Sequence, residues 1–316
     1  MISKRRAFIV GLKSLTISKK EREFLKKYKP WGIIIFQRNI KSFSQIKNLT
    51  FEIKKIFKDN LYPILIDEEG GRVNRFNKLF NTSIFSGEYF GGLYKKDKKK
   101  FELYYSIYSK QISSILRSSG ININTVPVLD LRRANSHNVI GDRSFGYISE
   151  NVSKIGDYSI NQFHKNKIGT VIKHIPGHGL ATIDSHLQTP IVNESKSILL
   201  KKDFKVFMNK KSLFAMTAHI IYKKIDNTNT ATHSKKIIKL IRNQLKFSNL
   251  IISDDISMKG LKYSIKENTK RAFSAGCNIV LHCNGNLKEM LIVAKNSPEI
   301  NKFIITKTSQ FYKIIT

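Results

Sequence analysis

The stretch Gly169-Thr170-Val171-Ile172-Lys173-His174 shows the pattern that decides the fold: a short, β-branched run that ends in polar residues. Seven other apolar runs of similar length occur along the chain, and amphipathic stretches of about ten to twenty residues separate nearly all of them. This alternation is typical of repeated βα units around a parallel sheet. The predicted strands are Ala7–Leu12, Gly32–Phe36, Pro63–Asp67, Ile123–Asp130, Gly169–His174, Leu213–His219, Leu250–Asp254 and Asn278–Cys283.

Eight predicted strands indicate an α/β fold, a (β/α)8 TIM barrel that forms a single domain over residues 1–316. No linker rich in Pro, Gly or Ser divides the chain, and the basic loop Tyr94–Lys100 is expected to lie inside a βα unit. The segment Ser18–Tyr28 begins with a helix-capping Ser and has Glu21 three residues later. The segment Ser42–Phe57 carries apolar residues at helical spacing. Both segments are therefore predicted to be helices.

The composition is that of a folded protein with a large excess of positive charge. The 316 residues include 56 Lys+Arg and 23 Asp+Glu, which gives a formal charge of +33, and 41% are hydrophobic. Disordered chains combine high net charge with too few apolar residues to build a core, so they are excluded. The basic clusters, such as Lys98–Lys100 and Lys210–Lys211, lie in separate stretches. This favours a chain-wide richness in Lys, Ile and Asn over a surface dedicated to nucleic acid.

Cysteine content and apolar runs predict the compartment. Cys277 and Cys283 cannot build a disulfide framework, and their spacing fits neither a zinc knuckle nor a redox pair. The basic Lys4–Arg6 precedes an apolar run that Lys13 closes after six residues, shorter than the ~7–15 residues of a secretory signal. No apolar run approaches the ~18–20 residues of a membrane span. We expect a cytoplasmic monomer that acts on a small molecule and has neither a membrane nor a nucleic-acid partner.

Ionisable side chains gather where the predicted strands end. The C-terminal ends of barrel strands meet at one mouth, where barrel enzymes carry out their chemistry. Helix capping or a hydrogen-bonded core histidine would explain each such residue alone. Together they favour a buried polar active site. The residues are Asp67, Asp130, Lys173, His174, His219, Asp254, Asp255 and His282.

The densest segment is KHIPGHGLATIDSH, which runs from Lys173 to His186. In an extended segment Asp184 and His186 point to the same side, so the carboxylate could hold the imidazole tautomer and raise its basicity for acid/base catalysis. The same segment also offers a set of zinc ligands, and spacing does not decide between these functions. Those ligands would be His174, His178, Asp184 and His186.

The segment Ile251–Met258 places a carboxylate at the end of an apolar strand, where the next helix is expected to begin. Helix amides and neighbouring cations would keep Asp254 ionised, and such a carboxylate could attack an anomeric carbon as in a retaining glycosidase. Asp254 could instead be a helix N-cap. Asp255 competes for either role.

Two further segments bring polar groups to the predicted mouth. Ile66–Arg75 sets Asp67 before a glycine pair, where the carboxylate could chelate two sugar hydroxyls. Three neighbours could instead pair with one another for structural reasons: Glu68, Glu69 and Arg72. Ile140–Gly146 presents Arg143 between glycines, which suits a forked contact to a carbonyl or hydroxyl group.

Several of these segments also match a known family. In chain order they are IDEEGGRVNRF (66–76), VIGDRSFG (139–146), KHIPGHG with DSH (173–186), the strand end Ala218-His219, and SDDISM (253–258). In this combination the chain resembles the β-N-acetylhexosaminidases of glycoside hydrolase family 3, the NagZ type. The resemblance implies a (β/α)8 barrel that needs no cofactor or metal and removes terminal N-acetylglucosamine. Its implied substrates are chiefly muropeptides bearing 1,6-anhydro-N-acetylmuramic acid, in peptidoglycan recycling.

The resemblance also implies roles for individual residues. Asp254 would be the nucleophile, and His186, paired with Asp184, would be the general acid/base of a retaining mechanism. An imidazole that has given up its proton is neutral, so it would not repel Asp254 as a second carboxylate would. The implied sugar-contacting residues are Asp67, Arg75, Arg143, Lys173 and His174.

Some positions depart from the family pattern. Glu68 stands where Gln is common, and Ile175 where Phe is common. His233 lies in Thr230–Ser234, where the family usually shows a Pro-Ala-Thr opening without a histidine. None of these departures falls on an implied catalytic residue.

Two other functions stay open. One is a metal-dependent barrel hydrolase with ligands in the His174–His186 loop. The other is a basic polyanion-binding protein, whose affinity would fall steeply with salt.

Overall fold

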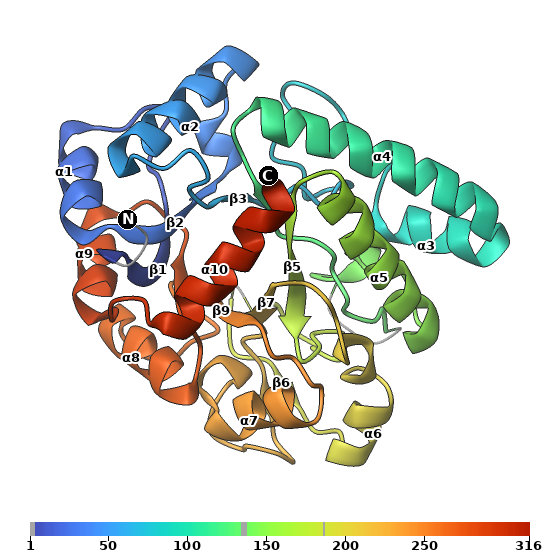
Figure 1. Cartoon of the computed structure of the whole chain (residues 1–316). Coiled ribbons are helices and arrows are strands. Elements are labelled where there is room, and N and C mark those ends of the chain that lie inside the picture. The colour runs from blue at the N-terminus through green and yellow to red at the C-terminus, as the bar shows by residue number, and fades with distance from the viewer. Residues whose placement is uncertain (1–3, 134–137, 186) are drawn as a thin grey trace.

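A closed parallel barrel forms the centre of the molecule (Figure 1). The computed structural model describes residues 4–133, 138–185 and 187–316. Within them, eight parallel strands close in the order β1-β10-β9-β7-β5-β4-β3-β2, which confirms the predicted (β/α)8 fold. They are β1 (Arg6–Gly11), β2 (Pro30–Ile35), β3 (Ile64–Ile66), β4 (Ile123–Asn124), β5 (Gly169–Ile175), β7 (Phe214–Thr217), β9 (Leu250–Asp255) and β10 (Ile279–His282).

Helices surround this barrel, and both helices that the sequence predicts most clearly are present. Ser18 and Glu21 form a complete capping box at the start of α1. The α-helices are α1 (Lys19–Tyr28), α2 (Phe43–Phe57), α3 (Gly87–Lys96), α4 (Lys98–Ser118), α5 (Ser149–Lys165), α6 (Lys196–Lys201), α7 (Lys235–Asn243), α8 (Ile265–Ala275), α9 (Leu287–Asn296) and α10 (Lys302–Ile315). Short 3-10 helices are η2 (Gln37–Asn39), η3 (Gly141–Arg143), η4 (Lys205–Phe207) and η5 (Ala231–His233). A small separate sheet pairs β6 (Ile191–Val192) with β8 (Ile221–Tyr222).

The strands bury apolar side chains on both faces, as parallel barrel strands must. In β1, Phe8 and Val10 join the core between barrel and helices, whereas Ala7 and Ile9 join the core inside the barrel. Helix α10 crosses the amino-terminal end of the barrel (Figure 1) and adds apolar side chains to this inner core. Trp31 fills that end and donates its indole N–H to Thr308 of α10 at 2.9 Å. The opposite end of the barrel is left for the polar groups.

Two details differ from the sequence-based expectation. Strand β4 ends at Asn124 instead of Asp130, because Pro127 has no N–H to donate to a strand ladder, and pairing resumes only as a single bridge at Val128. The basic segment Tyr94–Lys100 is not a loop but the end of α3 and the start of α4. Asp97 separates the two helices and caps α4 by accepting the Lys100 N–H at 3.0 Å.

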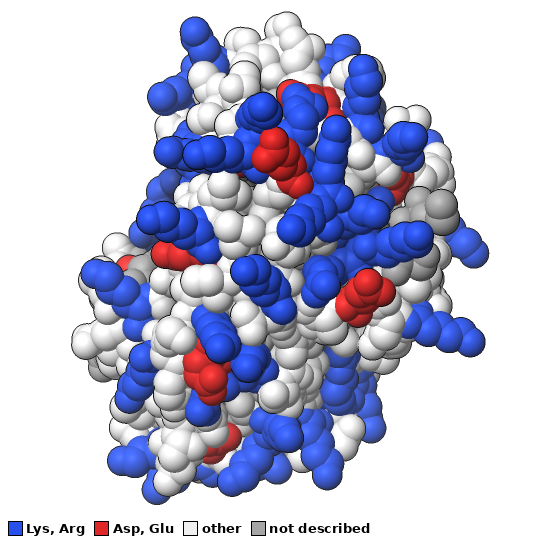
Figure 2. Space-filling view, turned by 90° about the vertical axis from the view of Figure 1, so that its left-hand side faces the viewer, with Lys and Arg blue, Asp and Glu red and all other residues white. Residues whose placement is uncertain are grey.

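On the face shown in Figure 2, positive charge is spread out instead of forming one patch. Figure 2 shows the face on the side of α1 and α9, where Lys and Arg side chains are scattered from edge to edge with small acidic groups between them. Among the described helices, none is long and apolar enough to cross a membrane.

Candidate active site

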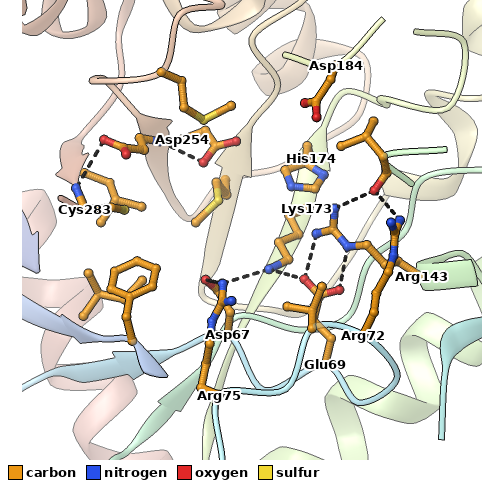
Figure 3. Close-up of a pocket in the computed structure, with 18 of the residues that line it drawn as sticks. Asp67, Glu69, Arg72, Arg75, Arg143, Lys173, His174, Asp184, Asp254 and Cys283 are labelled. Atoms are coloured by element: carbon orange, nitrogen blue, oxygen red, sulfur yellow. Dashed lines mark hydrogen bonds and ion pairs between the residues drawn. The ribbon is translucent and has the colours of Figure 1, made fainter. Parts of the chain in front are cut away.

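A pocket of about 570 Å³ opens where the strands end, within the size range of small-molecule sites. Of the eight residues to which the family resemblance assigns a catalytic or sugar-binding role, the structure brings seven to this pocket (Figure 3). The eighth, His186, lies outside the described residues. The seven are Asp67, Arg75, Arg143, Lys173, His174, Asp184 and Asp254.

A buried group of charges forms one side of the pocket. Lys173, from β5, places its Nζ 3.0 Å from Asp67 Oδ1 and 2.7 Å from Glu69 Oε1. The same Nζ donates to Thr125 Oγ1 at 2.9 Å, so three acceptors surround the ammonium group. Arg75 adds a contact of 2.9 Å from Nη2 to Asp67 Oδ2. The loop after β3 is thereby attached to β5.

These contacts keep the carboxylates ionised. Burial alone would raise the pKa of Asp67, but Lys173, Arg75 and the Thr125 hydroxyl outweigh it and hold that pKa below its ordinary value. Burial likewise opposes ionisation of Glu69, but Arg143 and Lys173 lower the pKa of Glu69 to about 2. The pocket side therefore carries fixed negative charges that are balanced by fixed cations.

The fork that the sequence predicts at Arg143 is present and holds a protein carboxylate. Its Nε and Nη2 each lie 2.8 Å from an oxygen of Glu69, and Nη1 donates to the Val139 carbonyl at 3.1 Å. Arg72 pairs with Asp142, with Nε 2.8 Å from Oδ1. The alternative in which Glu69 and Arg72 pair with each other is wrong, because the segment after β4 supplies a partner to each of them.

Glu68 points away from the pocket and organises the loop that carries its neighbours. Its Oε2 accepts the backbone N–H groups of Arg75 at 2.8 Å and Phe76 at 3.3 Å. Its main chain is bonded in both directions to the side chain of Asn124. Burial raises the pKa of Glu68 to about 7. Glu68, which stands where the family commonly has Gln, therefore has a structural role. Its carboxylate binds backbone N–H groups of its own loop and does not join the predicted pairing with Glu69 and Arg72.

His174 is held by a buried aspartate. Its Nδ1 lies 2.6 Å from Asp130 Oδ2, and Asp130 Oδ1 accepts the backbone N–H of His178 at 2.6 Å. Burial acts to raise the pKa of Asp130, but the His174 imidazole and these hydrogen bonds lower it below its ordinary value. Burial also lowers the pKa of His178 to about 4, so its imidazole is neutral, and Nε2 lies 3.1 Å from Ser185 Oγ. Asp130 thus orients the β5 end and the loop behind it.

The two acids at the end of β9 have different surroundings, although both line the pocket. The Asp255 carboxylate accepts the N–H and O–H of Ser257 and the N–H of Cys283, at 2.8 to 3.2 Å. It therefore closes a turn after β9 and links it to β10. Asp254 Oδ1 accepts the N–H of Asp255 at 2.8 Å. In Figure 3, Asp254 and Asp184 lie at the same end of the pocket, away from Asp67 and Glu69.

The helix expected directly after this strand begins later than predicted. Helix α8 starts at Ile265 and its N-cap is Ser264, whose hydroxyl accepts the Glu267 N–H. Asp254 is therefore not the N-cap of α8. The N-cap interpretation fails because residues 256–264 form an intervening connection.

Two histidines at strand ends do not line the pocket. His282 faces outward from β10, and its Nε2 lies 2.8 Å from Glu289 Oε2. His219 is fully buried and contacts Thr232 and the Asp255 main chain. The hydrogen-bonded core histidine is therefore the correct interpretation of both. Across residues 4–133, 138–185 and 187–316, no three His, Cys, Asp or Glu side chains are grouped so that they could hold a metal ion.

Three residues that shape the site have no role assigned by the resemblance: Glu69, Thr125 and Asp130. The sequence marks Asp130 only as a strand-end acid and Glu69 only as a candidate for an internal pair. Nothing in the sequence marks Thr125, because its function depends on contact with Asp67 and Lys173 from other strands.

Comparisons with known proteins agree with this geometry. Residues 6–308 match the model of the glycosyl hydrolase family 3 N terminal domain. A β-hexosaminidase of Haemophilus ducreyi is 33% identical over 287 residues, covering 87% of this chain and 80% of that protein. A β-hexosaminidase of Histophilus somni is 30% identical and covers 95% of this chain and 86% of that protein. Native NagZ from Neisseria gonorrhoeae superposes with a TM-score of 0.87 at 29% identity, covering 98% of this chain and 90% of that one. The chain therefore belongs to glycoside hydrolase family 3, among its β-N-acetylhexosaminidases.

Proposed function

We propose that the protein is a retaining exo-β-N-acetylglucosaminidase that acts on muropeptides. It removes terminal N-acetylglucosamine from N-acetylglucosaminyl-1,6-anhydro-N-acetylmuramic acid fragments in peptidoglycan recycling. The observation that carries the proposal is that Asp254 and Asp184 both line the pocket, in the part of it away from Asp67 and Glu69 (Figure 3). A structure similar to this chain is described as NagZ from Neisseria gonorrhoeae in complex with N-trifluoroacetyl-D-glucosamine.

Asp254 is the nucleophile in this proposal. Its neighbour Asp255 already accepts hydrogen bonds from Ser257 and Cys283, which ties that carboxylate to a structural turn. An oxygen of Asp254 attacks C1 of the sugar while the bond from C1 to the leaving oxygen breaks. The product is a glycosyl ester on Asp254.

His186 is the general acid/base, assisted by Asp184. It gives its proton to the leaving oxygen in the first step and takes a proton from water in the second. That water attacks C1, releases Asp254 and restores the original configuration. The Asp184 carbonyl accepts the N–H groups of Leu187 at 3.0 Å and Gln188 at 3.1 Å.

The charged side of the pocket is proposed to bind the sugar. A carboxylate accepts about four hydrogen bonds, and Asp67 receives three from described residues, which leaves capacity for a sugar hydroxyl. Arg75, Arg143 and His174 are proposed to donate to the sugar from the same side, and Lys173 to place its charge against it, because its three ammonium protons already have acceptors in Asp67, Glu69 and Thr125. Because protein carboxylates already hold these side chains in place, sugar binding requires little rearrangement of them.

The protein is proposed to act as a cytoplasmic monomer. Both cysteines are free thiols, which agrees with a reducing compartment.

The test compares the wild type with Asp254→Ala on a chromogenic aryl β-N-acetylglucosaminide, with and without a chelator. Turnover by the wild type should resist the chelator, and Asp254→Ala should lose at least about 10³-fold in kcat. Added azide should rescue Asp254→Ala and yield the α-glycosyl azide, because azide then attacks from the face that Asp254 vacated. His186→Ala with azide should yield the β-product instead.

Unchanged turnover in Asp254→Ala would refute the nucleophile assignment. Chelator-sensitive turnover would favour the metal-dependent hydrolase. The muropeptide assignment requires a higher kcat/KM on the anhydro-muropeptide disaccharide than on the N-acetylglucosamine disaccharide, and the reverse order would exclude it.

A further inference from the structure

Three buried polar side chains lie behind the proposed nucleophile and do not line the pocket. Thr217 ends β7, His219 follows two residues later, and Thr232 lies in η5. All three are fully buried. Thr232 Oγ1 lies 2.8 Å from Thr217 Oγ1 and 2.7 Å from His219 Nδ1, and His219 Nε2 lies 3.0 Å from the carbonyl oxygen of Asp255. They form a chain of contacts that ends on the backbone carbonyl of Asp255, the residue that follows Asp254.

The chemistry of the groups fixes the direction of each hydrogen bond. A carbonyl oxygen only accepts, so His219 Nε2 must carry a proton. Burial lowers the pKa of His219, with partial opposition from Asp254 and Asp255, so the imidazole is neutral and its Nδ1 is an acceptor. The Thr232 hydroxyl has two acceptors in reach, His219 Nδ1 at 2.7 Å and the Ala218 carbonyl at 3.3 Å, and it donates its single proton to the nearer one, Nδ1, while it accepts the proton of Thr217. The chain runs from Thr217 through Thr232 and His219 to the Asp255 carbonyl.

This chain holds the strand end from one side while the Asp255 carboxylate holds it from the other. The carboxylate contacts Ser257 and the Cys283 N–H, and His219 contacts the carbonyl of the same residue. The backbone carbonyl and the side-chain carboxylate of Asp255 are thereby both fixed, and Asp254 is the residue directly before it. We propose that Thr232 and His219 are positioning residues that set the orientation of Asp254 for attack on C1. This inference rests on the proposed role of Asp254.

The positioning role involves the segment Thr230–Ser234, which has no part in the proposed catalytic steps. The segment Thr230–Ser234 differs from the family pattern at His233, yet Thr232 occupies its centre and reaches β7 and His219. His233 contacts the carbonyl of Asn268 in α8 at 3.2 Å and takes no part in the chain. Thr232 is thus the member of this motif that connects to the site.

The test compares three substitutions in one short segment. Thr232→Val keeps the shape and removes the donor to His219, whereas Thr232→Ser keeps the hydroxyl. Thr230→Val is the matched control, because Thr230 Oγ1 is buried without a hydrogen-bond partner among the described residues. We expect Thr232→Val to lower kcat by about 10- to 100-fold with KM changed less than about threefold, because a small misplacement of a reacting group is costly. Thr232→Ser and Thr230→Val should stay within about twofold of the wild type.

A mechanism-based 5-fluoro-N-acetylglucosaminyl fluoride should label Asp254 in the wild type, and the labelling rate of Thr232→Val should fall in parallel with its kcat. Labelling elsewhere, or no turnover by the wild type, would refute the proposed function itself. Wild-type labelling at Asp254 with unchanged kcat in Thr232→Val would refute only the positioning role.

Nitrogen-15 NMR of histidine-labelled wild type at pH 7 provides a readout that needs no variant to fold. His219 should show the tautomer with the proton on Nε2. A proton on Nδ1, or a charged ring, would overturn the hydrogen-bond chain even if Thr232→Val failed to fold.

Discussion

Replacing Glu69 by Gln tests the buried charge group at the pocket. Glu69 contacts Arg143 and Lys173, and the side chains of Glu69 and Lys173 are only 5% and 3% exposed. Gln has nearly the same shape but no charge, so Arg143 would lose its ion-pair partner inside the protein. Breaking a buried pair by removing one partner typically costs about 3–5 kcal/mol.

The lowered pKa of Glu69 gives a similar estimate of how much the Glu69 charge stabilises the fold. Lowering it from 4.5 to about 2 on folding corresponds to about 3 kcal/mol of stability at pH 7. Because the folded-state pKa is the lower one, this contribution is complete above the unfolded value and disappears as pH falls through about 2. At pH 3 roughly half of it should remain.

Urea unfolding at pH 7 and pH 3 measures both numbers. The wild type should exceed Glu69→Gln by about 3 kcal/mol at pH 7 and by about 1.5 kcal/mol at pH 3, with unchanged m-values. Glu88→Gln is the matched control: Glu88 pairs with Arg132 in an exposed position, so its loss should cost less than about 1 kcal/mol. A pH-independent difference for Glu69→Gln, or one no larger than the control, would show that the charge group does not stabilise the fold as argued.

Two further predictions concern adjacent glycines of α3 and the free thiols. Gly91→Ala should destabilise the protein by more than about 2 kcal/mol, because the new Cβ would lie 1.8 Å from the Phe145 carbonyl oxygen. Gly92→Ala should stabilise it by about 0.5–1 kcal/mol, because nothing lies within 4 Å of the new Cβ. Equal effects of the two substitutions in thermal unfolding would contradict this prediction. Burial raises the pKa of Cys277 to about 12 and also raises that of Cys283, so native protein at pH 8 should react with iodoacetamide at least about ten-fold more slowly than unfolded protein. Rapid labelling of Cys277 in the native state, measured by mass spectrometry, would contradict the burial of this thiol.

Local sequence was sufficient to predict the fold. The predicted barrel strands are short, apolar, β-branched runs, and amphipathic stretches separate nearly all of them. Ser18 and Glu21 mark a helix start through contacts three residues apart. Such signals depend on neighbouring residues in the chain, so they can be identified from the sequence without a structure. Where a single residue interrupts the pattern, as Pro127 does after β4 and Asp97 does between α3 and α4, the predicted boundaries shift.

The sequence by itself also indicated that Asp67, Lys173, His174 and Asp254 reach the pocket, because strand ends in a parallel barrel meet at one mouth. The same rule indicated His219 and His282, which instead contact Thr232 and Glu289. Only the tertiary structure decided their partners. Arg143 and Glu69 are separated by 74 positions, and Lys173 and Asp67 by 106. Asp254 and Asp255 are adjacent acids that the sequence alone does not distinguish. In the structure, contacts from Ser257 and Cys283 tie the Asp255 carboxylate to a turn. The physical reason is that a charge or hydrogen-bond partner is chosen by distance in space, and these distances are set only when separate βα units close around one barrel.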